Sequence, residues 1–381
     1  MLDKIIKFTI IIGAALGLAA FIMHFTRKTK CIEKYKQSVP IPILIGGYGA
    51  TGGVKTLKNK DFFSSDVVNT SWMLRVKNNN IIINNEWGPW PANGKLYLMD
   101  EVQDGKEVRS YEMEEGGSKE KRLAGPVYFC LWKGTVYIAC YGNPAGDAGG
   151  ILTCSESLKE IKSVVCPVGG QSRIHCIDQF QPLNGNSFLI AVGFGAACLY
   201  KIDKGGVNFN TILYSFEKGV KPRHFIQIPN TNKIVVIIEG PDPKLVLLLY
   251  EDGNFEEVDL YDLTNLAPTS PSITGAAIKY HGEHIYCTIR TYKSVEGADD
   301  VAANGIFAKF TLEEDKLVKK AQVGVGKNPR YFAINKKDIA YIANQESMNV
   351  MQVYIKTMTQ SEVSEVSEVT EMDNEPAFIL L

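Results

Sequence analysis

The sequence predicts an all-β fold, a β-propeller, preceded by one N-terminal transmembrane helix. The main observation is a repeated unit: a turn rich in Asn, Gly or Lys, an apolar run, a polar break and a second apolar run. Successive copies start roughly 45 to 55 residues apart, the period of four-stranded propeller blades. The copies begin at Asn78, Lys133, Asn184, Thr231, Gly282 and Lys336. The other two observations are an uncharged apolar segment near the N-terminus and an acidic segment at the C-terminus.

The apolar segment from Phe8 to Phe25 contains about 18 residues without a formal charge when His24 is neutral, close to the length that spans a bilayer. Arg27 and Lys28 follow it, and this basic flank predicts a single-pass membrane protein with the propeller in the cytoplasm. The alternative is a cleaved secretory signal and a secreted domain. That alternative is weaker, because basic residues stand where the small-residue cleavage site is expected.

Residues 1–30 are therefore interpreted as a membrane anchor and residues 31–42 as a polar linker. Gly13 and Gly17 have the spacing that brings two membrane helices together, so a dimer through the anchor helix is a further hypothesis. Ile43 to Tyr48 then predicts a strand. Because an N-terminal strand often completes the last blade of a propeller, we expect this strand to pair near Met351 to Ile355. The propeller is assigned to residues 43–357.

The C-terminal segment, residues 358–381, is predicted to be a disordered acidic tail. Ser361 to Asp373 is a Ser-Glu-Val repeat without aromatic residues. Such a composition offers too little apolar area to offset the entropy lost on ordering.

Composition excludes several classes of function. The net charge of −1 lacks the basic excess of a nucleic-acid-binding protein. None of the eight cysteines is in C-x-x-C spacing, which argues against a metal-thiolate site. The Gly-rich strings at Gly46 to Gly53 and Gly142 to Gly150 lack a following Gly-Lys-Ser/Thr, so turns explain them better than phosphate loops.

The stretch from Gly219 to Gly240 carries the strongest functional signal. Lys221 to His224 is interpreted as a turn, and Ile234 to Ile238 is an apolar run of strand length. Glu239 follows directly, where a strand leaves the core and working side chains are common. The alternative is a surface ion pair between Arg223 and Glu239.

Several strings resemble the lactonase-type seven-bladed propellers, a family that includes bacterial 6-phosphogluconolactonases and fungal carboxymuconate cyclases. The strings are GVKPRHF from Gly219, GKNPRYFAI from Gly326 and ANQES from Ala343. The resemblance extends from about Ile43 to Lys356 and implies seven blades, no metal and no organic cofactor. It also implies a small anionic lactone or sugar-phosphate substrate.

The resemblance assigns roles to residues at the propeller mouth. The catalytic residues it implies are His175, Arg223, Glu239 and Arg290, and the substrate-binding residues are His224, Arg330, Asn344 and Gln345. We expect His175 to act as a general base with the ordinary histidine pKa near 6.5, so that the rate rises through about pH 6 to 7. The alternatives are that His175 is a satisfied strand-start histidine and that Arg290 pairs with Glu296 or Asp299 on the surface.

One departure from the family pattern keeps other functions open. Many members have an aspartate-containing D-L-G-x-D, where this chain has VGFGAA from Val192. The sequence therefore predicts a lactone hydrolase that resembles a propeller-type 6-phosphogluconolactonase. The alternatives are a carboxymuconate cyclase-like intramolecular lyase and a non-catalytic, membrane-anchored propeller scaffold.

Overall fold

The structure is a computed structural model. The chain divides into two units, Met1–Pro42 and Ile43–Leu381. It describes residues 42–49, 53–58, 62–64, 67–86, 94–102, 105–113, 123–143, 148–166, 173–203, 207–267, 272–292, 305–358, 366–372 and 374–381. The predicted transmembrane segment Phe8 to Phe25 lies outside these residues, as does the linker up to residue 41. No helix within the described ranges is long and apolar enough to span a bilayer. The membrane anchor and the dimer through it therefore stay predictions.

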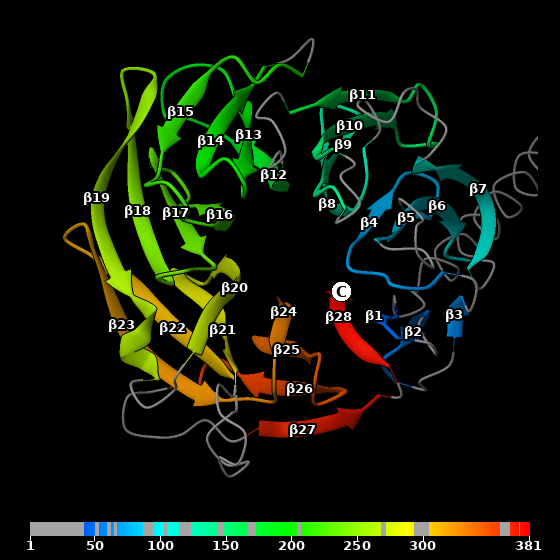
Figure 1. Cartoon of the computed structure of the whole chain (residues 1–381). Helices are drawn as coiled ribbons and strands as arrows, with labels where there is room; N and C mark the ends of the chain where they lie inside the picture. Colours follow the sequence, from blue (N-terminus) through cyan, green and yellow to red (C-terminus); the bar gives the residue numbers. More distant parts are fainter. Residues whose placement is uncertain are drawn as a thin grey trace, which may run out of the picture. The chain divides into compact units, whose positions relative to one another are not determined.

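The second unit, Ile43–Leu381, is a ring of seven four-stranded antiparallel sheets, which confirms the seven-bladed propeller (Figure 1). The first blade has the order β28 (Glu375–Leu380), β1 (Leu44–Tyr48), β2 (Val54–Thr56) and β3 (Phe62–Ser64). Blades 2 and 3 contain β4 (Met73–Val76), β5 (Asn80–Asn85), β6 (Lys95–Asp100), β7 (Lys106–Glu112), β8 (Pro126–Trp132), β9 (Thr135–Cys140), β10 (Gly150–Ser155) and β11 (Lys162–Val165).

The remaining blades follow in chain order. Blades 4 and 5 contain β12 (Ile174–Phe180), β13 (Phe188–Gly193), β14 (Cys198–Ile202), β15 (Ile212–Ser215), β16 (Pro222–Gln227), β17 (Lys233–Ile238), β18 (Lys244–Glu251) and β19 (Asn254–Asp262). Blades 6 and 7 contain β20 (Ser272–His281), β21 (His284–Tyr292), β22 (Ile306–Glu313), β23 (Lys316–Gly324), β24 (Pro329–Ile334), β25 (Ile339–Asn344), β26 (Asn349–Tyr354) and β27 (Val366–Glu371). A short 3-10 helix, η3 (Leu263–Leu266), follows β19.

The core lies between the faces of neighbouring blades. On β17, Ile234, Val236 and Ile238 pack toward blade 4, whereas Val235 and Ile237 pack toward blade 6. Successive side chains of a strand point to opposite faces, so a continuous apolar run is required where both faces are covered. This packing explains why the second strand of each repeat unit reads as an uninterrupted apolar run.

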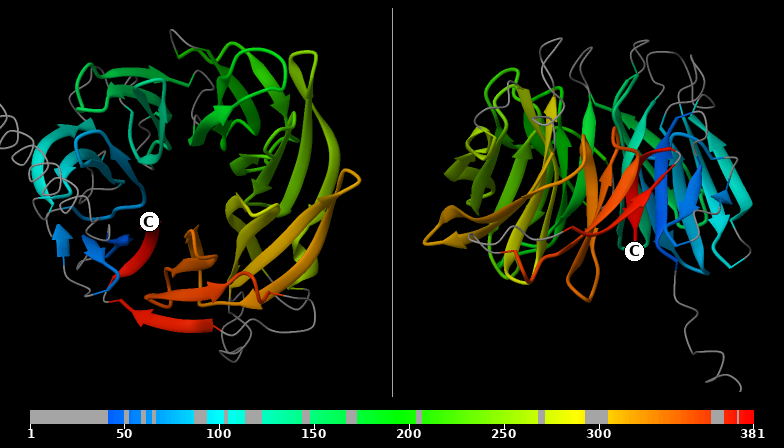
Figure 2. Two further views of the ribbon diagram at one scale, coloured as in Figure 1. Left: turned by 180° about the vertical axis from the view of Figure 1, so that it is seen from behind. Right: turned by 90° about the horizontal axis from the view of Figure 1, so that it is seen from below.

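The ring is closed differently from the prediction. We expected Ile43 to Tyr48 to pair near Met351 to Ile355, but β1 pairs with the C-terminal strand β28, with Leu44 opposite Leu380. The C-terminus accordingly lies near the centre of the ring (Figure 2). Closure still joins the first and last strands of this unit in one sheet, which closes the ring of blades.

The prediction that residues 358–381 form a disordered tail is also wrong for the residues of this segment that the structure describes. Val366–Glu371 is β27, the outer strand of blade 7, and it pairs with β26 from Asn349 opposite Glu371 to Val353 opposite Val366. The apolar end of the segment forms β28, in which Phe378 and Ile379 are buried. An outer strand needs backbone pairing on one side only, so its acidic composition does not prevent ordering. The propeller therefore extends from Ile43 to the last residue.

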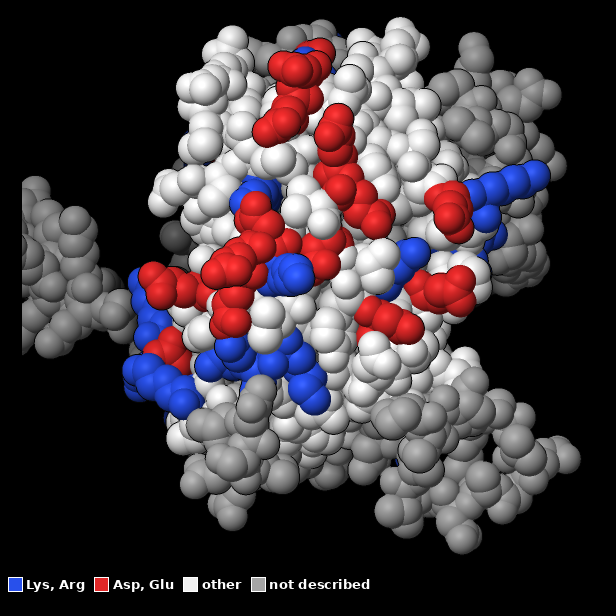
Figure 3. Space-filling model, turned by 90° about the vertical axis from the view of Figure 1, so that its left-hand side faces the viewer, with Lys and Arg blue, Asp and Glu red and all other residues white. Residues whose placement is uncertain are grey.

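The outer face of the ring carries mixed charge. Figure 3 shows Lys and Arg interspersed with Asp and Glu on the side where Figure 1 places β18, β19 and β23. Exposed Glu256 and Glu257 lie on β19, and Lys320 of β23 pairs with Glu313. Both signs of charge are present on this face, in keeping with a net charge of −1 for the chain.

Candidate active site

A cavity of about 400 Å³ lies at the centre of the ring, and residues from all seven blades line it. Its lining consists of Tyr48, Glu86, Val127, Tyr141, His175, Arg223, Glu239, Arg290, Arg330 and Gln345. Six of the eight predicted site residues are in this set, so the structure brings these six side chains together.

β-Bulges in the inner strands turn three of these side chains toward the cavity. The pairing register shifts at His175 on β12, at Arg223 on β16 and at Arg330 on β24. Two residues of the bulged strand then oppose one of its partner, which re-aims a side chain. Lys221 to His224 is thus not a turn as predicted: Pro222–Gln227 is the inner strand β16. Pro222 begins this strand, a position where a missing backbone donor is tolerated.

The ends of the second strands supply the other group. Glu86 follows β5, Tyr141 follows β9, Glu239 follows β17 and Gln345 follows β25, each as the first residue past the strand. These positions are equivalent in the repeat, so the fold carries them all to the same rim of the ring. The site is therefore a product of the propeller repeat and not of one local motif.

Two arginines hold Glu239 at one wall of the cavity. Arg223 Nη1 donates to Glu239 Oε2, and Arg290 Nη2 lies 3.1 Å from the same oxygen. Arg223 and Arg290 are each 5% exposed, so the ion pair of Arg223 with Glu239 is buried and not on the surface. The alternative that Arg290 pairs on the surface with Glu296 or Asp299 is wrong, because Arg290 is buried against Glu239. Burial by itself would raise the pKa of Glu239, but the charges of Arg223 and Arg290 outweigh it and lower the pKa to about 2.

Gly275 on β20 allows this cluster to form. Arg290 Nη2 also donates to the Gly275 carbonyl oxygen at 3.3 Å, and the Gly275 amide donates to the Glu239 carbonyl oxygen at 3.2 Å. A Cβ at position 275 would lie 2.4 Å from the carbonyl oxygen of Ile238, which is closer than any side chain permits. The absence of a side chain thus lets blades 5 and 6 approach closely enough for Arg290 to reach Glu239.

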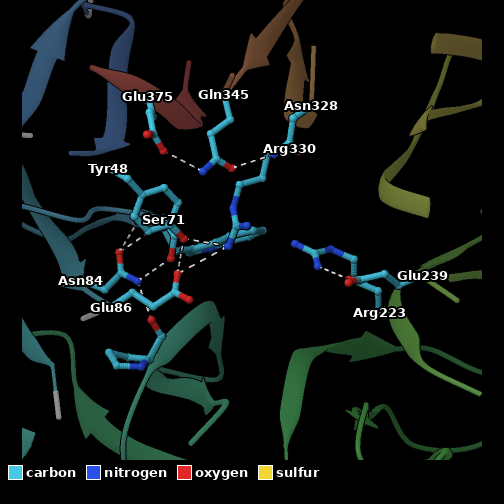
Figure 4. Close-up of polar contacts among 12 residues, drawn as sticks. Tyr48, Ser71, Asn84, Glu86, Arg223, Glu239, Asn328, Arg330, Gln345 and Glu375 are labelled. Atoms are coloured by element: carbon cyan, nitrogen blue, oxygen red, sulfur yellow. Dashed lines mark hydrogen bonds and ion pairs between the residues drawn. The ribbon is translucent and has the colours of Figure 1, made fainter. Parts of the chain in front are cut away.

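A second acidic group faces the first cluster from the opposite wall (Figure 4). Arg330 Nη2 donates to the Tyr48 hydroxyl at 2.7 Å, and that hydroxyl donates to Glu86 Oε2 at 2.5 Å. Arg330 Nη2 also lies 3.6 Å from Glu86 Oε2. Burial raises the pKa of Tyr48, which keeps its proton at any pH of interest. The five charged residues of the cavity lining, three arginines and two glutamates, sum to one positive charge.

His175 is packed among aromatic rings. Tyr141, Phe194 and His224 lie with ring centroids 5.6, 5.7 and 5.0 Å from it. Burial, together with the charges of Arg223 and Arg330, lowers the pKa of His175 well below its ordinary value. The expectation of a pKa near 6.5 is therefore wrong, and His175 is neutral across the physiological range.

The residue Phe194 marks the departure from the family pattern. It follows β13 in the VGFGAA string, at the position equivalent to Glu239 in blade 5, and it is 5% exposed. Its ring covers His175 and Tyr141. The aromatic ring of Phe194 therefore covers His175 and contributes to shielding its imidazole from water.

Two predicted binding residues lie outside the lining of the cavity. His224 is 5% exposed and borders a much smaller cavity together with Trp72 and Tyr331. Asn344 is fully buried and donates to Asn349 Oδ1 at 2.9 Å, where it joins β25 to β26. Both residues stabilise the propeller around the site rather than border the space that a substrate would occupy.

Tyr48, Glu86 and Tyr141 were missed by the sequence analysis. The repeat itself contained the signal for two of them, because Glu86 and Tyr141 follow their apolar runs as Glu239 does. Tyr48 had no such signal, since its place in the site depends on the closure of the ring. Within the described residues no group of three or more His, Cys, Asp or Glu side chains is placed to hold a metal ion.

The comparisons agree with this architecture. A family model described as lactonase, 7-bladed beta-propeller, matches residues 90–378. A proposed 6-phosphogluconolactonase from Bacteroides fragilis is 14% identical with a TM-score of 0.63, over 90% of this chain and 99% of that chain. A periplasmic gluconolactonase from Pseudomonas aeruginosa is 17% identical with a TM-score of 0.65, over 89% and 98%. No curated protein sequence matches. At these identities the structural neighbours establish the fold.

Proposed function

The chain belongs to the family of lactonases with a seven-bladed β-propeller, and on that premise we propose that it hydrolyses a lactone with an anionic substituent at the central cavity. The observation that carries the proposal is the convergence of Arg223, Arg290, Glu239 and His175 on one cavity. A lactone hydrolase needs a positive group for an oxyanion and a neutral base for a water molecule, and this cavity supplies both. The sugar lactones named for the neighbours are the first candidates.

Arg223 and Arg290 supply the positive groups in this proposal. Their guanidinium planes are fixed by the shared carboxylate of Glu239, so little side-chain entropy is lost when a ligand binds. We assign the anionic substituent to Arg223 and the carbonyl oxygen to Arg290. The contact from Arg290 stabilises the negative charge that develops on the carbonyl oxygen in the transition state.

His175 is the base in this proposal. Its imidazole takes a proton from a water molecule, whose oxygen attacks the carbonyl carbon to give a tetrahedral intermediate. When the intermediate collapses, the ring C–O bond breaks and the alkoxide leaving group takes the proton back from the imidazolium. The product is a hydroxy acid, and His175 returns to its neutral form. The nearby guanidinium charges that lower the pKa of His175 also favour this second transfer.

Glu239 is a positioning residue rather than a base in this mechanism. A carboxylate with a pKa of about 2 is a poor proton acceptor at neutral pH. Its function is to hold two buried guanidinium groups, which would otherwise repel each other, in one orientation.

The test is a direct assay of the purified chain. We expect it to accelerate the hydrolysis of 6-phosphogluconolactone above the spontaneous rate, and His175→Gln to remove the acceleration. Gluconolactone, which lacks the anionic substituent, should be hydrolysed more slowly. Glu101→Gln, which removes a carboxylate paired with Arg75 outside the cavity, is the matched control. Turnover of carboxymuconate instead of the sugar lactones would indicate the cyclase-like reaction. Absence of turnover of all three compounds would favour a non-catalytic propeller.

A further inference from the structure

The two carboxylates of the cavity differ in how they are held. Glu239 has two guanidinium partners, and both contact its Oε2. Glu86 receives one hydrogen bond, from the Tyr48 hydroxyl, and lies at the longer distance of 3.6 Å from Arg330. Glu86 is thus the less neutralised of the two carboxylates, although its side chain is only 5% exposed.

Two hydrogen bonds fix the position of Glu86. Its amide donates to the Asn69 carbonyl oxygen at 3.0 Å, and its carboxylate is held by Tyr48, which in turn accepts from Arg330. A carboxylate offers about four acceptor positions, and the Tyr48 hydroxyl uses one of them. Because Glu86 also lines the cavity, acceptor capacity faces the space where a ligand would lie.

The opposite walls therefore favour different parts of a ligand (Figure 4). The Arg223 and Arg290 wall favours an anionic group, because guanidinium groups bind carboxylate and phosphate with charge-assisted hydrogen bonds. The Glu86 wall favours hydroxyl groups, which donate hydrogen bonds to a carboxylate. A second anionic group beside Glu86 would meet a like charge in a poorly solvated site. Arg330 lines the same wall, but its Nη2 already contacts the Tyr48 hydroxyl and lies 3.6 Å from Glu86 Oε2, so its charge is shared with this carboxylate.

We propose that Glu86 is the specificity-determining residue of the cavity: it selects ligands with one anionic group and several hydroxyl groups and rejects dicarboxylates. This inference rests on the proposed function for the reaction, but it concerns ligand choice and can be measured without turnover. It assigns Tyr48 and Arg330 the role of positioning residues, which hold the carboxylate of Glu86 toward the ligand.

Two six-carbon ions test the inference by calorimetric titration of the full chain. D-gluconate has one carboxylate and five hydroxyl groups, whereas hexanedioate has two carboxylates and no hydroxyl group. We expect the wild-type protein to bind gluconate at least about tenfold more tightly than hexanedioate. Glu86→Gln keeps the shape and removes the charge, so it should reduce that ratio about tenfold or more, mainly through tighter binding of hexanedioate.

Three further variants sharpen the test. Glu101→Gln, with the same change in charge outside the cavity, should leave the ratio unchanged. Tyr48→Phe removes the hydroxyl but keeps the Glu86 charge, so discrimination against hexanedioate should persist. Glu86→Ala provides a second neutral variant, and whichever neutral variant gives a native circular dichroism spectrum decides the question.

Several results would overturn the inference. One is an unchanged ratio of the gluconate and hexanedioate affinities in the folded neutral variant. Another is that Tyr48→Phe loses discrimination against hexanedioate to the same extent as Glu86→Gln. The third is that the wild-type protein binds neither ion at millimolar concentration. Failure of the proposed function would look different. The wild-type protein would then hydrolyse no lactone, while the ratio of the two affinities would still respond to Glu86.

Discussion

The substitution Glu239→Gln tests the electrostatic account of the site. Glutamine has the shape of a protonated glutamate, so the variant imitates the neutral form of Glu239. The structure lowers the pKa of Glu239 from its ordinary value of 4.5 to about 2. At about 1.4 kcal/mol for each pKa unit, the ionised form contributes about 3 kcal/mol to the free energy of unfolding at neutral pH. Removal of one partner from a buried ion pair, typically about 3 to 5 kcal/mol, gives a similar magnitude.

The pH dependence distinguishes this explanation from a simple packing defect. A carboxylate with a lowered pKa in the folded state contributes its full stability above pH 4.5 and loses it as the pH falls through 2. Urea unfolding followed by circular dichroism should therefore give a difference of about 3 kcal/mol between wild type and Glu239→Gln at pH 7, which shrinks between pH 4.5 and 2. A difference that stays constant over this range, or one below about 1 kcal/mol at pH 7, would refute the reasoning.

Four further predictions follow from the site and the fold. His175→Gln should lower kcat by roughly two to four orders of magnitude. Because the pKa of His175 is lowered, the wild-type rate should be level from pH 8 to below pH 6, and a step in the rate between pH 6 and 7 would contradict this. Arg223→Ala should mainly raise KM and Arg290→Ala mainly lower kcat in steady-state kinetics, and the reverse pattern would exchange the two roles. Deletion of residues 375–381 should open the ring and abolish cooperative unfolding, whereas a truncated protein that melts like the full chain would show that β28 is dispensable. We also propose that the propeller faces the cytoplasm. Asn69, which begins the glycosylation acceptor Asn69-Thr70-Ser71, should then carry no glycan in a gel-shift assay with a glycosidase.

The sequence was most informative where the fold repeats. The apolar run Ile234 to Ile238 predicted β17 to within one residue, because a strand covered on both faces must be apolar throughout. The same regularity placed Glu239 at the strand end and so at the cavity. Glu86 occupies the equivalent place after β5, and it could have been found by comparing the copies position by position.

Departures from regular pairing were harder to predict. The bulge at Arg223 turns that side chain toward the cavity, but a bulge has no strong signal in a single sequence, and the Pro222 before it suggested a turn. The pKa of His175 could not be predicted from the sequence either. It depends on Phe194, Arg223 and Arg330, which lie in three different blades and come together only in the folded ring.

Ring closure is a further feature that the sequence did not predict correctly, and it builds one wall of the site. Tyr48 on β1 lies opposite Glu375 on β28, and Glu375 accepts a hydrogen bond from Gln345 at 2.9 Å. Tyr48 in turn joins Arg330 to Glu86, which follows β5 in the second blade. The wall that faces Arg223 and Glu239 is therefore complete only when the last residues of the chain pair with the first strand. Because such pairing joins residues more than 300 positions apart, no local pattern encodes it, and the acidic repeat before β28 conceals it.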